Sequence, residues 1–283
     1  MSKSGNSVCV FVQIPKTAET TFNFILSREY GKKRNCWAPS NHVGAGFEFF
    51  NDLSDHKKNK INLVRGHMYY GIHQFIDRPV HYISFLRDPI SRIFSYYYHM
   101  QREAIVHSDK GGDWYETARS GITLLDYIQQ IPDKLLDNDQ VRRISGIDFP
   151  YNGCKEEHLN IAKQRVLNNF KFIGVTEYFD ESVLAIKNKL SWKKYPLYVN
   201  ENVNQKNIIN HESDKNTIQE IKLHNKYDQQ LYDFANKLFN ERIQNFDENF
   251  NKQLAYYRKI SLLAGVFLPP ILKIYRTIRK IKE

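Results

Sequence analysis

The chain has 283 residues, of which 41% are hydrophobic and 25% charged, a composition typical of a folded globular protein rather than a disordered or fibrous one. The formal net charge is +10, but residues 258–283 hold seven basic residues and a single acidic one. The excess therefore belongs to the tail, which argues against a nucleic-acid-binding domain with a basic stripe on its folded body.

Cysteine usage and the N-terminus indicate an intracellular protein. The three cysteines form no CxxC pair, which excludes a disulfide framework or a cysteine zinc site and suits a reducing compartment. The first apolar run, Val8–Val12, is short and is followed closely by Gln13 and Lys16. Such a run is neither a signal peptide nor a membrane anchor. We therefore expect a cytoplasmic protein.

Four apolar, β-branched or aromatic runs predict buried strands: Val8–Val12, Ile61–Val64, Val80–Leu86 and Phe170–Val175. Residues at helical spacing fill most of the chain between them. This alternation predicts an α/β protein with a central parallel sheet that is flanked by helices. We place one domain over residues 1–250 and a basic, apolar tail over residues 251–283.

Helices and loops are predicted between and after these strands. Asp88-Pro89 and Asp180 each precede a helical pattern and predict N-caps, the first with proline at the opening position. Residues 35–60 predict an irregular excursion, and residues 192–216 a long functional loop. The segments expected to be mainly helical are Gln101–Gln140, with a break at residues 110–113, and Ile218–Phe239.

The turn after the first strand is a candidate anion site. Residues 13–21 read Gln-Ile-Pro-Lys-Thr-Ala-Glu-Thr-Thr, and helical spacing follows from Phe22. A strand, a short turn and a helix in this order gather free backbone N–H groups at the positive end of the helix dipole. Lys16 adds a cation, and the threonines add hydroxyl donors. The alternative interpretation is a threonine-rich helix cap, and the turn lacks the glycines of a Walker loop.

This turn closely resembles the P-K-T-A-x-T-[ST] loop of the sulfotransferase family that includes heparan sulfate 2-O-sulfotransferase and many bacterial relatives. The resemblance implies a P-loop-NTPase-like sulfotransferase fold that uses 3′-phosphoadenosine 5′-phosphosulfate (PAPS). The residues that would cradle the 5′-phosphosulfate are Lys16, Thr17, Ala18, Glu19, Thr20 and Thr21. Many members have glycine where this chain has Glu19, so we expect that side chain to point away from the phosphate.

A second segment, residues 85–98, is similar to the family's F-x-R-x-P-x-x-R-x-x-S-x-Y-Y motif. The resemblance implies that Arg87 and Ser95 grip the 3′-phosphate of the donor, a role that suits the donor fork of arginine. Arg92, one turn into the helix, is better explained as a structural ion pair. Residues 166–184, 225–239 and the Gln140-Val141-Arg142 segment resemble further parts of the family. Lys206 is a weaker candidate for closing over the 3′-phosphate.

The chemistry of sulfuryl transfer assigns two catalytic candidates. Charge develops on the departing phosphate oxygen, where Lys16 would stabilise it. The acceptor hydroxyl needs a general base, and histidine suits neutral pH. His67 follows the second predicted strand within a Gly-His segment similar to the one that carries the family's base, and His73 is the second choice. No metal-ligand spacing such as HExxH occurs, so we expect no metal.

The tail allows two interpretations. Residues 260–272 are apolar and broken by Pro269-Pro270, and basic residues follow. About 13 uncharged residues cannot span a bilayer of roughly 30 Å, but the pattern suits peripheral attachment to the anionic inner face of a membrane. The tail equally suits an arm that packs on its own domain or on a partner subunit.

The sequence as a whole therefore predicts a PAPS-dependent O-sulfotransferase that acts on a carbohydrate hydroxyl, with a saccharide or glycolipid acceptor and no nucleic acid as partner. Two alternatives stay open. One is a nucleoside or sugar kinase-like phosphotransferase, which is disfavoured by the missing Walker glycines. The other is a non-catalytic protein that binds membranes or polyanions.

Overall fold

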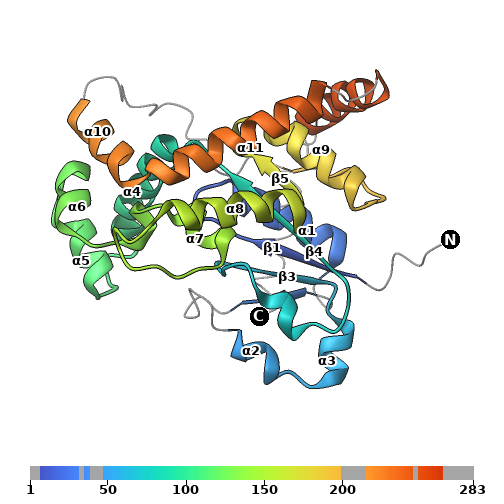
Figure 1. Cartoon of the computed structure of the whole chain (residues 1–283), viewed down its shortest axis with the longest axis horizontal. Helices are drawn as coiled ribbons and strands as arrows, with labels where there is room; N and C mark the ends of the chain where they lie inside the picture. Colours follow the sequence, from blue (N-terminus) through green and yellow to red (C-terminus); the bar gives the residue numbers. More distant parts are fainter. Residues whose placement is uncertain (1–6, 32–34, 39–46, 199–214, 245–247, 264–283) are drawn as a thin grey trace.

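A computed structural model describes residues 7–31, 35–38, 47–198, 215–244 and 248–263 (Figure 1). Its centre is a five-stranded sheet in the order β2-β3-β1-β4-β5, and every pair of neighbouring strands is parallel. The strands are β1 (Val8–Val12), β2 (Asn35–Trp37), β3 (Leu63–Gly66), β4 (Val80–Leu86) and β5 (Phe170–Val175). The predicted α/β class with a central parallel sheet is confirmed.

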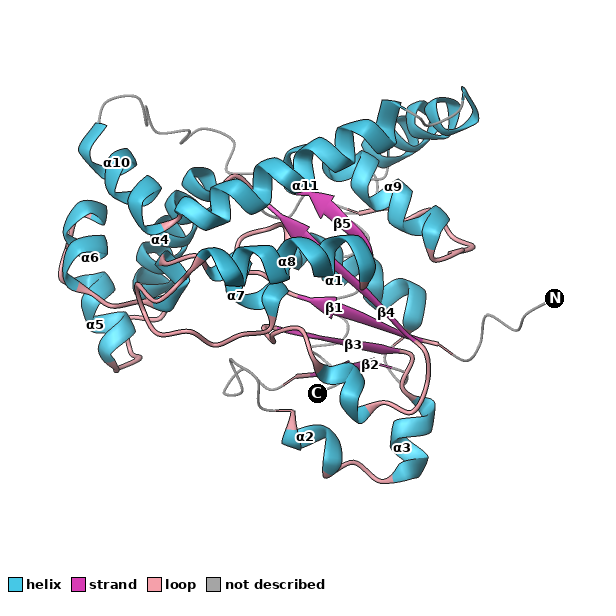
Figure 2. Cartoon of the chain, viewed as in Figure 1, coloured by secondary structure: helices cyan, strands magenta, loops and turns pink. Residues whose placement is uncertain are grey.

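Helices cover both faces of this sheet. The labelled helices are α1 (Glu19–Tyr30), α2 (Glu48–Asn51), α3 (Asp55–Lys60), α4 (Pro89–Val106), α5 (Asp113–Arg119), α6 (Leu124–Gln130), α7 (Asp139–Ser145), α8 (Glu156–Asn168), α9 (Phe179–Lys189), α10 (Lys215–His224) and α11 (Lys226–Gln244), not all of which contact the sheet. Figure 2 shows α8 and α11 crossing in front of the sheet. On α1, Phe22 packs edge-on against Phe11 of β1 and Phe85 of β4, with ring centroids 4.9 and 4.8 Å apart.

A second hydrophobic cluster lies beside the sheet. It joins α4, α5, α6 and α10 through buried side chains such as Ile93, Met100, Tyr127 and Ile221. In Figure 1 these helices form the group at the left of the molecule. The long helix α4 belongs to this cluster and is separated from the end of β4 by two residues. It therefore connects the carboxyl ends of the strands to the helical group.

The structure corrects several boundaries. β3 begins at Leu63, two residues later than predicted, and residues 35–60 contain β2, α2 and α3 rather than an irregular excursion. Asp88 does cap α4, since its carboxylate accepts the Ser91 N–H at 2.7 Å. Asp180 does not cap α9, which begins at Phe179; its carboxylate instead accepts the Tyr198 hydroxyl at 2.7 Å. The predicted last helix is broken at Asn225 into α10 and α11.

Helices α7 and α11 cap each other in the interior. The Asn138 side-chain oxygen accepts the N–H groups of Tyr227 and Asp228 at 2.9 and 3.0 Å. In return, the Asp228 carboxylate accepts the N–H groups that open α7 at 3.1 and 2.8 Å. Arg92 of α4 lies 3.8 Å from the Asp228 carboxylate, and both side chains are fully buried. The prediction that Arg92 is a structural ion pair is confirmed.

Replacing Asp228 by alanine is expected to lower the free energy of unfolding by about 3–5 kcal/mol. The change removes one of the two carboxylates that face the buried Arg92, the other being Asp139, and the acceptor of the N–H groups that open α7. Chemical denaturation measures this loss. Asp233→Ala is the matched control: this aspartate lies on the same helix, is exposed, and should cost below about 0.5 kcal/mol. Equal losses for the two variants would contradict the structural role given to Asp228.

Residues 248–263 are helical, and their side chains Phe250, Leu254 and Tyr257 join the main hydrophobic core. Arg258 forms an ion pair with Glu181 of α9 at 2.6 Å. The first part of the predicted tail therefore packs on the domain, while residues 264–283 lie outside the described residues. Among the described helices, none is both long and apolar enough to cross a membrane.

Candidate functional site

The turn between β1 and α1 has the backbone geometry of an anion site. Lys16 and Ala18 are both left-handed, with φ of 70° and 63°. Ala18 is the N-cap of α1, and its methyl group offers no hydrogen-bond acceptor. The N–H groups of the first turn of α1 are therefore not capped by that side chain and are available to a bound anion at the positive end of the helix.

A cleft of about 600 Å³ opens at this turn, on the carboxyl edge of the sheet. Seven of the predicted donor-binding residues line it: Lys16, Ala18, Glu19, Thr20, Thr21, Arg87 and Ser95. The first five come from the turn and the start of α1, while Arg87 and Ser95 come from the end of β4 and from α4. The structure thus brings together two motifs that are about 70 residues apart in the sequence. The Arg87 guanidinium donates a hydrogen bond to the Lys16 carbonyl, 71 residues earlier in the chain.

Thr17 and Glu19 of the turn differ in their relation to the cleft. The Thr17 side chain is fully buried, and its hydroxyl donates to the Ile14 carbonyl at 2.8 Å. This threonine therefore shapes the turn and is not a lining residue of the cleft. Glu19 is one of the residues that line the cleft. Its negative charge acts on Lys16, whose pKa is lowered mainly by burial and raised in part by this carboxylate.

Arg87 is held in place through both its side chain and its backbone. Its guanidinium Nη1 donates to the Lys16 carbonyl at 2.9 Å, which ties the end of β4 to the turn. Its backbone N–H donates to the Gln140 side-chain oxygen at 3.0 Å, and the Gln140 amide nitrogen donates back to the Arg87 carbonyl at 2.9 Å. Gln140 is fully buried in α7. The interlocked pair α7 and α11 therefore positions the backbone of Arg87.

The two histidine candidates lie at different places. His67 follows β3, and its Nδ1 is 3.4 Å from the Gln13 carbonyl oxygen, at the start of the turn. Burial, and next the positive charge of Arg143, lower its pKa below the ordinary value of 6.5, with Glu19 partly opposing this shift. The imidazole is therefore neutral near pH 7, the form that accepts a proton. His67 is not among the residues that line the cleft.

His73 is turned toward the strand rather than toward the turn. Its Nδ1 lies 2.9 Å from the Tyr82 hydroxyl, and its backbone N–H donates to the same oxygen at 2.9 Å. Tyr82 belongs to the first half of β4, whereas Arg87 follows the last residue of that strand. The structure therefore does not bring His73 to the candidate site.

The cleft is also lined by six residues that the sequence did not indicate: His99, Arg102, Glu103, Thr176, Phe179 and Tyr198. His99 and Arg102 lie one and two turns beyond Ser95 on α4, so their helical spacing from it was a usable signal. Thr176 and Phe179 follow β5, at the same edge of the sheet. Tyr198 gave no local signal. Lys206 lies outside the described residues, as does most of the predicted loop.

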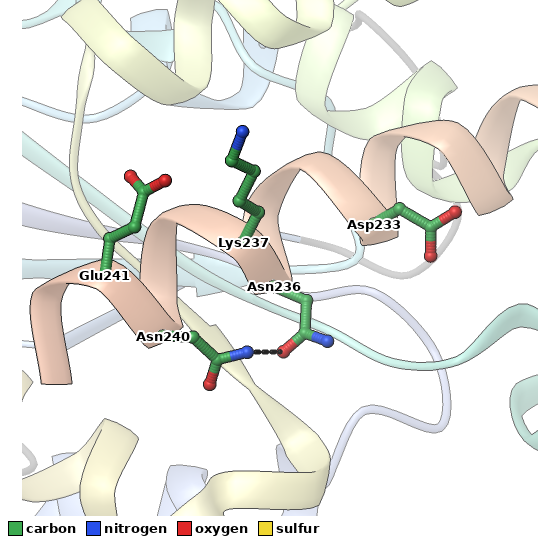
Figure 3. Close-up of a pocket in the computed structure, with 5 residues that line it drawn as sticks. All are labelled: Asp233, Asn236, Lys237, Asn240 and Glu241. Atoms are coloured by element: carbon green, nitrogen blue, oxygen red, sulfur yellow. Dashed lines mark hydrogen bonds between the residues drawn. The ribbon is translucent and has the colours of Figure 1, made fainter. Parts of the chain in front are cut away.

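A second hollow, of about 490 Å³, runs along the outside of α11. Its lining residues are Asp233, Asn236, Lys237, Asn240 and Glu241, all from this one helix. Figure 3 shows these side chains spread along the helix instead of converging, with a hydrogen bond of 3.3 Å between Asn240 and Asn236. A single helix face does not enclose a ligand, so the cleft at Lys16 is the candidate active site. Among the described residues, no group of three or more potential metal ligands occurs.

Comparison with known proteins identifies relatives over most of the chain. Residues 3–259 match the sequence profile of the family described as galactose-3-O-sulfotransferase. Human heparan-sulfate 6-O-sulfotransferase 1 is 26% identical over 85% of this chain and 67% of its own length. The proteins of the same name from Cricetulus griseus and Mus musculus are each 27% identical over 85% of this chain, and over 69% and 67% of their own lengths. The relatives confirm the sulfotransferase family that the motifs resemble, and they are named as 6-O-sulfotransferases rather than as the 2-O member.

Proposed function

The chain belongs to the galactose-3-O-sulfotransferase family, and from this membership we propose how its cleft binds the donor and transfers the sulfuryl group. The protein is a PAPS-dependent O-sulfotransferase. The observation that carries the proposal is the bond between the Arg87 guanidinium and the Lys16 carbonyl. It joins an anion-binding turn to a second cationic position within one cleft, as a nucleotide with phosphates at both its 5′ and 3′ positions requires.

In the proposed complex, the 5′-phosphosulfate lies on the turn formed by Lys16, Ala18, Glu19, Thr20 and Thr21. Backbone N–H groups and the helix dipole favour its negative charge. Arg87 and Ser95 bind the 3′-phosphate, the arginine through its charged donors and the serine through its hydroxyl. Both side chains line the same cleft as the turn. Thr17 acts only by keeping the turn in shape.

The transfer step uses Lys16 and His67. The acceptor oxygen forms a bond to sulfur as the bond between sulfur and the 5′-phosphate oxygen breaks. His67 takes the hydroxyl proton, and the electron pair of the broken bond stays on the departing phosphate of 3′-phosphoadenosine 5′-phosphate (PAP). Lys16 stabilises this growing charge, which is larger in the transition state than in the bound donor. The lowered pKa of His67 keeps the imidazole neutral and ready to accept the proton.

We propose that the acceptor is a saccharide. Support comes from the relatives, which are named for sulfation of heparan sulfate. The test is a screen with sulfur-labelled PAPS against polysaccharides, glycolipids, a small alcohol and a tyrosine peptide. Label is expected on a saccharide hydroxyl. Transfer only to the alcohol or the peptide would refute the acceptor class, and binding of ATP without binding of PAP would favour a kinase instead.

Replacing Gln140 by leucine is expected to weaken PAP binding by up to about thirtyfold, because two hydrogen bonds that position Arg87 are lost at about 1 kcal/mol each. Calorimetric titration measures this loss. In an Arg87→Met background the same change should have little further effect on PAP affinity, because Gln140 acts through Arg87. Gln130→Leu, an exposed glutamine, is the matched control. Fully additive losses would show that Gln140 has a general structural role only.

A further inference from the structure

One wall of the donor cleft is a face of α4 that carries charge. Ser95, His99 and Arg102 follow one another at helical spacing and all line the cleft, with Glu103 beside them. Lys16 of the turn lines the same cleft. Among the charged groups that act on His99, Lys16 has the largest effect, and Arg102 acts on both His99 and Lys16. The α4 wall and the turn at Lys16 therefore face the same cleft.

His99 is held by its neighbours on the helix. Its Nδ1 lies 3.7 Å from the Glu103 carboxylate and 3.5 Å from Nη2 of Arg102. Glu103 also faces His107, whose Nε2 is 3.5 Å from the other carboxylate oxygen. The His99 side chain remains 35% exposed. Its ring is therefore positioned between Arg102 and Glu103 and is still accessible to a ligand in the cleft.

We propose that His99 and Arg102 form, with Lys16, an anion subsite at the phosphosulfate end of the cleft, and that His99 takes up a proton when the donor nucleotide binds. This inference rests on the proposed function. Each phosphate monoester of PAP carries a charge of about −1.5 to −2 near pH 7. Placing such an anion beside an imidazole favours the imidazolium form, which adds a cation and a second N–H donor.

The direction of the pH effect follows from linkage. Burial, and then Lys16, lower the pKa of His99 in this structure, and the bound anion raises it. The affinity for the nucleotide is therefore expected to increase as the pH falls from the pKa of His99 in the complex to its lower pKa in the free protein. The increase is at most about tenfold per pH unit. The charged groups that act on His99 are Lys16 from the turn, Glu19 from α1, and Arg102 and Glu103 from α4.

The experiment is calorimetric titration of the full chain with PAP at pH 6.5 and 8.5, in buffers of different ionisation enthalpy. The buffer dependence of the heat counts the protons taken up. Wild type is expected to take up more protons than His99→Asn and to bind PAP several-fold more tightly than that variant at pH 6.5, with similar affinities at pH 8.5. Since PAP itself titrates in this range, the difference between the two proteins isolates His99.

His107→Asn is the matched control, because it removes the other histidine partner of Glu103 without removing a cleft residue. It should bind PAP with the proton uptake of wild type. Equal proton uptake by wild type and His99→Asn would overturn the inference while leaving the donor site intact. Failure of wild type to bind PAP at all would refute the proposed function instead. With adenosine 5′-phosphosulfate, which lacks the 3′-phosphate, wild type should still take up more protons than His99→Asn. Equal proton uptake with this ligand would overturn the placement of His99 near Lys16.

Discussion

Replacing Lys16 by methionine is expected to lower kcat by about 10²–10³-fold, the loss typical when one group that stabilises transition-state charge is removed. Methionine keeps an unbranched apolar stem in the turn and removes only the charge. The affinity for PAP should fall much less, because the backbone N–H groups of the turn and the Arg87–Ser95 pair remain. Steady-state rates with labelled PAPS, together with PAP titration, measure the two effects separately.

The comparison between these two losses decides the role of Lys16. A kcat that stays near wild type, with a large loss of PAP affinity, would mean that Lys16 only binds the donor. Lys222→Met provides the matched control, because this lysine is exposed on α10 and does not line the cleft. That variant should resemble wild type in both measurements.

Replacing His67 by alanine is expected to lower the rate of transfer by about 10²–10⁴-fold, the usual contribution of a general base. Donor binding should stay near wild type, because His67 does not line the donor cleft. His73→Ala is the matched control, since this histidine followed the same predicted strand but binds Tyr82 in the structure. Transfer by His67→Ala within a few-fold of wild type would contradict the assignment.

The pH dependence of transfer gives an independent test of His67. Because burial and Arg143 lower its pKa below 6.5, the imidazole is neutral at pH 7 and becomes protonated only in more acid solution. At saturating donor, the rate is therefore expected to be level near neutral pH and to fall as the pH drops below about 6.5. Measuring this profile in the His99→Asn background separates it from proton uptake at His99. A rate that rises toward acid pH would be incompatible with a neutral histidine base.

Most strands and the start of α4 could be predicted from the sequence, because a strand or a helix cap depends on residues that are neighbours in the chain. Three of the four predicted strands have the predicted bounds, and Asp88-Pro89 begins α4 as expected. Strand β2 was missed because it is three residues long and only partly buried, so its sequence lacks an apolar run. Asp180 was misread as a cap because its carboxylate binds Tyr198, a residue 18 positions away that no local pattern indicates.

The sequence by itself determined the turn around Lys16 and the position of Arg87 at the end of a strand. It also determined which candidate site residues are charged, since all of these are properties of short segments. Only the tertiary structure decided which of them meet. Arg87 reaches the Lys16 carbonyl across 71 residues, because parallel strands bring their carboxyl ends to one edge. It reaches Gln140 across 53 residues because α7 packs beside that edge. The same packing buried Thr17 and placed His73 on Tyr82, since burial is decided by tertiary packing. His99 and Arg102 follow Ser95 at helical spacing, but only the placement of α4 beside the turn brings them to the cleft.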